Sequence, residues 1–244
     1  MQNLFDPKKF NWEKYWAGNW HFISAWSFGY YYAYSVKEVM GENLRKAAVV
    51  SRGRHSRCYL DHKDRERFGQ FICSKVTKNN KTTEAFCLDL KNKADTLIEI
   101  SENLLGKNTV SEQKFIHFTE FFQRYSGLHV SVRHIVDFLD EEKLAKYLTR
   151  LQESLLYADQ VYLKTEMVFI KWAKQIANEI GLDERLILCL TSDEIARFYV
   201  TGELPDQQDL KNRSDNSLII FKGSSYEVYT GKEAEDLEKQ LSGG

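Results

Sequence analysis

The chain has 244 residues, of which 43% are hydrophobic and 28% charged, and its formal net charge is −1. This length accommodates one large domain or two modest ones, and the balanced charge excludes a global field that would draw the chain to nucleic acid or membrane. No apolar run reaches the roughly 18 residues that a membrane span requires, and the first residues lack the apolar core of a secretory signal. We therefore expect a cytoplasmic protein with no membrane partner.

Proline occurs only at positions 7 and 205, which leaves nearly the whole chain free to form helix. The expected fold class is mainly α: a helical bundle around one long helix, with a small C-terminal β-hairpin. We expect an aromatic-rich and basic N-terminal segment (1–60) that packs on a helical bundle (61–181). Short helices and the hairpin follow (182–244), as a connector to a missing swivelling domain.

The N-terminal segment has two unusual compositions. Residues 10–40 are dense in aromatic side chains and hold four of the five tryptophans, and residues 45–67 are rich in arginine and lysine. Residues 47–60 combine small, β-branched and basic residues. This stretch fits either a short strand or an ordered loop.

The helical period begins near residue 63. One helix is expected to end at Gly106, and the next, capped by Ser111, at Gly127, since glycine is typical just after a helix C-terminus. The longest apolar repeat runs over 141–180 without glycine or proline and is expected to close at Gly181. An unbroken helix of that length would measure about 60 Å, so it is either the spine of the bundle or kinked.

After this segment the long helical repeat gives way to shorter patterns. Thr191 and Glu194 have the spacing of a capping box that opens a short helix. Two β-rich runs, SLIIFKG and YEVYTG, meet at Gly223-Ser224-Ser225 and predict a hairpin. The last helix, 232–241, is polar, and we expect it to be the least protected element.

The sequence contains no self-sufficient catalytic motif. The sequence has no GxxxxGK[ST] or GxGxxG loop for phosphates, no GxSxG or HExxH motif, and no zinc-ligand spacing among its histidines and cysteines. The four cysteines form no CxxC pair, which favours reduced, buried thiols. We therefore assign no catalytic residue and no metal ligand.

The aromatic segment contains the candidate ligand-binding residues Trp16, Trp20, Trp26 and Tyr30. Indole and phenol rings offer broad apolar faces with polar edges, which suits a pocket for a large, partly aromatic ligand. The alternative is that these rings pack in the core or between two lobes.

The basic segment contains the candidate anion-binding residues Arg52, Arg54 and Arg57. Arginine forks match phosphate oxygens, but a solvated loop would have the same composition. The isoelectric point of about 6.6 and the lack of a known RNA-binding module argue against nucleic acid as a partner.

The last third resembles the helical region of phosphoenolpyruvate-utilising phosphotransferases of the phosphoenolpyruvate synthase-like and rifampicin phosphotransferase-like kind. In that family a long helix ends at a glycine-leucine turn, and a helix start, an arginine, a hairpin and a glycine-x-glutamate-alanine turn follow. The corresponding residues here are Gly181-Leu182, Leu190 to Ile195, Arg213, Tyr226 to Tyr229, and Gly231 to Ala234.

The resemblance implies a function for the chain. Family members combine an ATP-grasp domain, a helical region that holds the acceptor substrate, and a swivelling domain with a phospho-accepting histidine. This chain lacks the glycine loop of the first and the histidine motif of the third, so it resembles the middle part and is not catalytic alone. ATP, phosphoenolpyruvate and Mg²⁺ would belong to the other domains, in cis or in trans, and a small-molecule acceptor to this one. The alternative is a stand-alone helical adaptor that binds a protein partner.

Overall fold

Helices account for most of the chain, and the computed structural model describes residues 10–242. Residues 1–9 and 243–244, which belong to the first and last expected parts, lie outside the described residues. The elements in chain order are β1 (Trp12–Asn19), α1 (Phe22–Tyr30), the π-helix η2 (Tyr31–Ser35), α2 (Val36–Met40), β2 (Lys46–Arg52), β3 (His55–Asp61), α3 (His62–Val76), α4 (Asn80–Leu105), α5 (Glu112–Asp137), α6 (Glu141–Asp159), α7 (Val161–Ile180), α8 (Glu184–Ile187), α9 (Ser192–Thr201), α10 (Gln207–Asp215), β4 (Ser217–Lys222), β5 (Ser225–Thr230) and α11 (Gly231–Ser242).

The mainly α class is confirmed, but the sheet is larger than the expected hairpin. The β4–β5 hairpin forms as predicted, within a five-stranded antiparallel sheet of order β1-β3-β2-β4-β5. Residues 47–60 form most of a second hairpin, β2–β3. Strand β2 pairs with β4, from Lys46 opposite Lys222 to Ser51 opposite Ser217. The sheet therefore joins the first and last of the three expected parts.

Both faces of the sheet are covered by helices. Ala47 and Val49 of β2 point into the main core, toward α1, whereas Ala48 and Val50 point to a second cluster between the sheet and α11. Because side chains alternate between the faces of a strand, a strand buried on both sides needs apolar residues at consecutive positions. This explains why the runs AAVV and LIIF show no alternation of apolar and polar residues.

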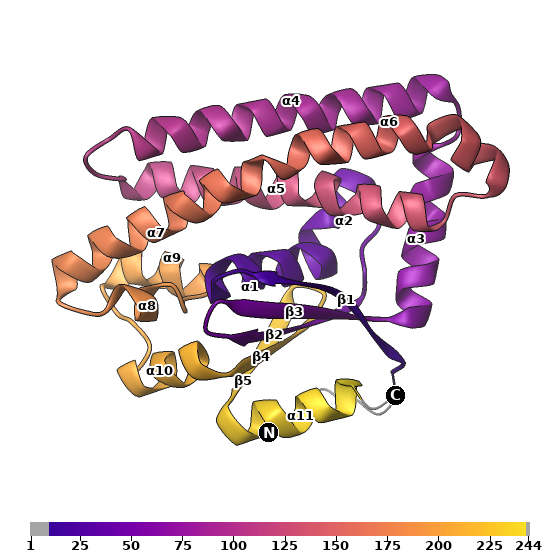
Figure 1. Cartoon of the computed structure of the whole chain (residues 1–244). Helices are drawn as coiled ribbons and strands as arrows, with labels where there is room; N and C mark the ends of the chain where they lie inside the picture. Colours follow the sequence, from indigo (N-terminus) through magenta and orange to yellow (C-terminus); the bar gives the residue numbers. More distant parts are fainter. Residues whose placement is uncertain (1–9, 243–244) are drawn as a thin grey trace.

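The layers are visible in Figure 1, where α11 lies below the sheet and α1, η2 and α2 lie above it. Helix α5 follows, with α4 and α6 outermost. Every residue of α5 from Tyr125 to Val132 is buried, so α5 is the central helix rather than the 141–180 segment. Within residues 10–242 no helix is both long enough and apolar enough to cross a membrane.

Helix α5 continues through Gly127, where the sequence predicted its end. A β-carbon at Gly127 would fall on the hydroxyl of Tyr31, which lies against this point of the helix. The glycine thus serves a close approach of η2 to α5, and the prediction of a helix end was wrong because these two uses of glycine look alike in sequence.

The 141–180 segment is kinked, one of the two expected alternatives. Helix α6 ends at Asp159 and α7 begins at Val161, while Gln160 between them keeps helical dihedral angles (φ −61°, ψ −23°). The Tyr125 hydroxyl donates a hydrogen bond to the Ala158 carbonyl at this point. A side chain that bonds to a helix carbonyl is a known cause of a kink. Gly181 closes α7 in the left-handed conformation, as predicted.

The predicted capping box at the start of α9 is present, with Thr191 and Glu194 bonded reciprocally. Glu194 also accepts two hydrogen bonds from the guanidinium of Arg213 in α10, at 2.7 and 2.9 Å. Arg213 is buried and also bonds to Asp209. This arginine therefore joins α9 to α10 next to the sheet.

Helix α11 packs on the outer face of the sheet, although its sequence predicts a loosely held element. Ala234 and Leu241 are buried there against strand residues. The carboxylate of Glu238, also buried, accepts from Arg52 at 2.6 Å and pairs with Arg57 at 3.1 Å. A few apolar residues suffice because the sheet supplies most of the apolar surface.

We predict that Gly127→Ala destabilises the protein by about 1–3 kcal/mol, because the added methyl group overpacks the contact with Tyr31. The control is Gly106→Ala, whose β-carbon would come no closer than 3.4 Å to another atom and whose φ of −77° suits alanine. It should be neutral or stabilise the protein by about 0.4–1 kcal/mol. Urea unfolding of both variants measures the difference, and equal effects would contradict the close approach.

We also predict that backbone amides of 235–241 exchange with solvent nearly as slowly as those of β4, because the buried contacts of α11 must open first. Hydrogen exchange followed by mass spectrometry measures this. Glu238→Ala should speed exchange in α11 selectively, whereas Glu235→Ala, an exposed change on the same helix, should not. Rapid exchange of α11 in the unmodified protein would instead support the loosely held connector.

Candidate ligand pocket

A cavity of about 140 Å³ lies where the end of β1 meets α1, η2, α5 and the α6–α7 junction. Its walls come from segments far apart in sequence. The lining residues are Trp16, Ala17, Gly18, Trp20, Phe28, Tyr32, His129, Val130, Arg133, Asp159 and Tyr162.

Three interruptions of regular secondary structure border this cavity. Strand β1 has a register shift at Tyr15, since Lys14 pairs with Tyr59 and Trp16 with Cys58. The π-helix η2 carries Tyr32 into the wall, and the kink after Asp159 forms another side. β-Bulges and π-helical turns occur frequently at functional sites, where they redirect side chains. Their convergence on one cavity distinguishes it from ordinary core packing.

Aromatic rings form most of the wall. Trp16 and Trp20 both pack against Phe28, with ring centroids 5.6 and 5.3 Å apart, and Trp20 also lies 5.5 Å from Tyr162. A β-carbon at Gly18 would collide with the Trp20 indole. Glycine at this position therefore allows the indole to fold back over β1 toward the cavity.

A chain of hydrogen bonds crosses the other side of the cavity. His129 Nε2 lies 2.7 Å from Asp159 Oδ1, and His129 Nδ1 lies 2.7 Å from the Tyr162 hydroxyl. Because a carboxylate can only accept, Nε2–H donates to Asp159, and in the neutral ring Nδ1 then accepts from Tyr162. This order of groups holds the tyrosine ring and the carboxylate in fixed positions.

The protonation states of these groups follow from burial. Burial lowers the pKa of His129, which outweighs the opposing effect of its bond to Asp159, so the ring is neutral at pH 7. Burial raises the pKa of the Tyr162 hydroxyl, which stays protonated. Partial burial acts to raise the pKa of Asp159, but the bond from His129 and the charge of Arg133 lower it. The cavity thus presents one negative group, Asp159, and one positive group, Arg133.

A second polar pair anchors the β1–α1 connection. His21 Nδ1 lies 2.6 Å from Glu166 Oε2, and both side chains are largely buried. His21 follows Trp20, and Glu166 is one turn along α7 from Tyr162. The pair therefore fixes the backbone next to the place where Trp20 meets Tyr162.

The four predicted ligand-binding residues divide between two places. Trp16 and Trp20 line the cavity. Trp26 is 1% exposed, stacks on Tyr30 at 4.8 Å and meets Tyr226 edge-on. Trp26 is therefore core, as the alternative had it, and Tyr30 lies with it beside the β4–β5 hairpin instead of at the cavity.

The three predicted anion-binding arginines do not converge on an open site. Arg52 and Arg57 pair with Glu238 of α11, and the exposed Arg54 lies in the turn between β2 and β3. The anion-binding interpretation thus conflicts with the structural use of two of these residues.

Sequence reasoning missed His129, Arg133, Asp159 and Tyr162, which line the cavity from the helical side. The available signal was spacing. His129 and Arg133 are four residues apart and lie on one face of α5, and Asp159 and Tyr162 are three residues apart on the two sides of the break at Gln160. Polar residues within an apolar stripe could have been noticed, but not their convergence.

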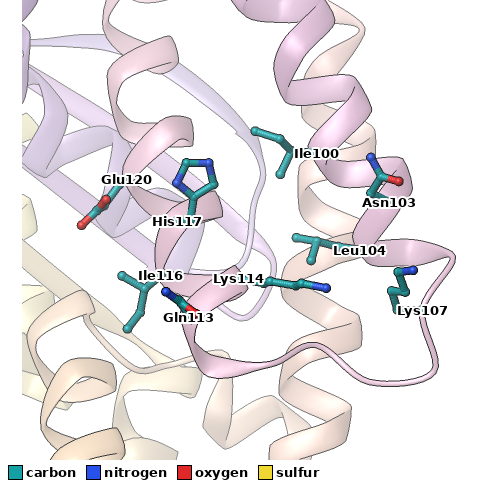
Figure 2. A pocket seen from close by; sticks show the side chains of 9 residues that line it. All are labelled: Ile100, Asn103, Leu104, Lys107, Gln113, Lys114, Ile116, His117 and Glu120. Carbon is teal, nitrogen blue, oxygen red and sulfur yellow. The ribbon is translucent and has the colours of Figure 1, made fainter.

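A wider hollow of about 670 Å³ lies at the surface between the end of α4 and the start of α5. Figure 2 shows Lys114 of α5 extended toward the α4 side, with His117 and Glu120 further along α5. These polar side chains are exposed, as are Asn103 and Lys107 opposite. No Trp, Tyr or Phe lines this hollow, whereas such rings form most of the wall of the smaller cavity, so we favour the aromatic cavity.

Nothing in residues 10–242 assembles three or more His, Cys, Asp or Glu side chains around a common metal position. All four cysteines are buried and carry free thiols. No protein-family model matches the chain, and neither a curated protein nor a solved structure matches it.

We predict that His134, behind the Tyr32 wall, makes the protein sensitive to acid. Its ring stacks on Tyr15 at 4.6 Å, and neither nitrogen has a hydrogen-bond partner within residues 10–242. Burial, aided by the charge of Arg65, lowers its pKa to about 3. Between pH 6.5 and 3 the unfolded chain therefore binds a proton that the folded protein does not. As the pH is lowered through this range, this group alone should decrease the free energy of unfolding by up to about 1.4 kcal/mol per pH unit.

His134→Phe should remove this contribution and flatten the pH dependence, as measured by urea unfolding at several pH values. His117→Phe, a change at an exposed position on the same helix, is the control and should leave the slope unchanged. Equal slopes in both variants would show that His134 is not held neutral.

Proposed function

We propose that this chain binds a small organic molecule in the cavity lined by Trp16, Trp20 and Tyr162. The observation that carries the proposal is the convergence of a β-bulge, a π-helix and a helix kink on one cavity. That space combines aromatic walls with a few fixed polar groups, which is the usual composition of a small-molecule site.

The proposal agrees with the role expected from the resemblance to phosphoenolpyruvate-utilising phosphotransferases. In that role the chain holds the acceptor and does not transfer phosphate by itself. ATP, phosphoenolpyruvate and Mg²⁺ would then be bound by ATP-grasp and swivelling histidine domains in cis or in trans. Binding in the cavity needs none of these partners, so it can be tested with this chain alone.

A second candidate, the helical adaptor, is favoured by one observation on another surface. Leu156, Leu163 and Met167 are 69, 74 and 48% exposed. Their spacing of seven and four residues places them along one side of the kinked α6–α7 segment. A row of exposed apolar side chains is typical of a surface that binds another protein, but these three side chains do not line the cavity.

We predict that phenol and tert-butanol, used as probes, shift the NMR signals of the Trp16 and Trp20 indole N–H groups. Ala17→Phe at the exposed rim and Val130→Phe inside the cavity should each weaken these shifts at least tenfold, because the larger side chains occupy the space. Ile116→Phe, which fills the hollow of Figure 2 instead, is the control and should change nothing. Melting temperatures establish that each variant is folded. Shifts confined to the α4–α5 hollow, or none at all, would refute the proposal.

A further inference from the structure

The aromatic walls of the cavity meet at steep angles instead of facing each other in parallel. Trp16 and Trp20 stand at 79° and 75° to Phe28. Tyr162 continues the corner, at 65° to Trp20 and 66° to Phe28. A flat ring stacks between parallel faces, whereas steeply inclined rings suit a rounded group. We call the rings of Trp16, Trp20, Phe28 and Tyr162 the aromatic box. Aromatic boxes of this kind bind alkylated ammonium groups through cation–π attraction.

The two charged residues of the cavity have opposite signs. Asp159 is partly exposed, and only its Oδ1 is bonded to His129, so Oδ2 has no hydrogen-bond partner in the described part of the chain. Arg133 is exposed and, unlike Arg52 and Arg213, has no carboxylate partner among residues 10–242. A purely cationic ligand would gain nothing from Arg133, and a purely anionic ligand would be repelled by Asp159. A ligand with both charges satisfies both residues.

The size of the cavity limits the ligand to a compact molecule. Its volume is about 140 Å³. A protein cavity of about 150 Å³ holds one benzene molecule, so roughly six to eight non-hydrogen atoms fit here. A branched ammonium group would fill the aromatic box, and a short chain would bring a carboxylate to the mouth.

We infer that the ligand is a compact zwitterion, whose alkylated ammonium group lies in the aromatic box beside Asp159 and whose carboxylate pairs with Arg133. This inference rests on the proposed small-molecule function and names the chemical class of the ligand. It requires no covalent step.

Four probes of nearly equal shape separate the two charges. Glycine betaine carries both charges, choline only the positive one, 3,3-dimethylbutyrate only the negative one, and 3,3-dimethylbutanol neither. Calorimetric titration of the full chain should give a dissociation constant for glycine betaine at least tenfold lower than for choline or 3,3-dimethylbutyrate. The uncharged alcohol should bind most weakly.

Two variants assign the charges to residues. Arg133→Met should weaken betaine binding at least tenfold, to the level of choline, without weakening choline. Asp159→Asn should weaken betaine and choline but not 3,3-dimethylbutyrate. The matched control is Arg124→Met, since Arg124 is an exposed arginine of the same helix outside the cavity. It should leave all four affinities unchanged.

Each remaining outcome decides the question. If choline or 3,3-dimethylbutyrate binds as tightly as betaine, one of the two charges is not recognised and the zwitterion is refuted. If none of the four binds while phenol and tert-butanol still occupy the cavity, the zwitterion is refuted and the small-molecule function stands. If neither set of probes binds, both proposals fail.

Discussion

The hydrogen bond from the Tyr125 hydroxyl to the Ala158 carbonyl is the contact on which the geometry of the cavity depends. It lies where α6 gives way to α7, and Asp159 follows immediately. Asp159 ends one helix and Tyr162 lies in the first turn of the next, and both bond to His129 on α5. Tyr125 and His129 are one turn apart on the same buried face of α5. Tyr125 bonds to the kink, and His129 bonds to the side chains beside it. The contacts that pack α5 against the α6–α7 junction therefore also position the side chains of the cavity.

Much of the fold was predictable from local patterns, and the failures have a common physical cause. The C-terminal hairpin, the capping box at Thr191 and the helix end at Gly181 follow from local backbone chemistry, which sequence records directly. The size of the sheet was not predictable, because β2 is buried on both faces and lacks alternation. The predicted helix end at Gly127 was wrong for a related reason: the role of this glycine depends on Tyr31, a residue nearly a hundred positions away.

The candidate site was half predictable. The tryptophan-rich segment drew attention to Trp16 and Trp20 through composition, but composition treats Trp26 in the same way, and only packing separates them. Arg52 and Arg57 showed charge without showing that Glu238, far along the chain, neutralises it. Arg133 and Asp159 are ordinary surface residues by sequence. Their significance arises from tertiary convergence, which no local pattern contains.

The pairing of β2 with β4 also has a consequence for the order in which the protein forms. Ser51 and Ser217 lie side by side in the sheet, although 166 residues separate them. Closing so long a loop costs conformational entropy before any contact compensates for it, so such pairing is slow compared with helix formation. During synthesis, the helices from α3 to α7 can associate before β4 leaves the ribosome. Strands β1 and β3 can already pair with their neighbours, but β2 must wait for β4, and its exposed apolar edge makes this interval the one in which a nascent chain is most vulnerable to aggregation.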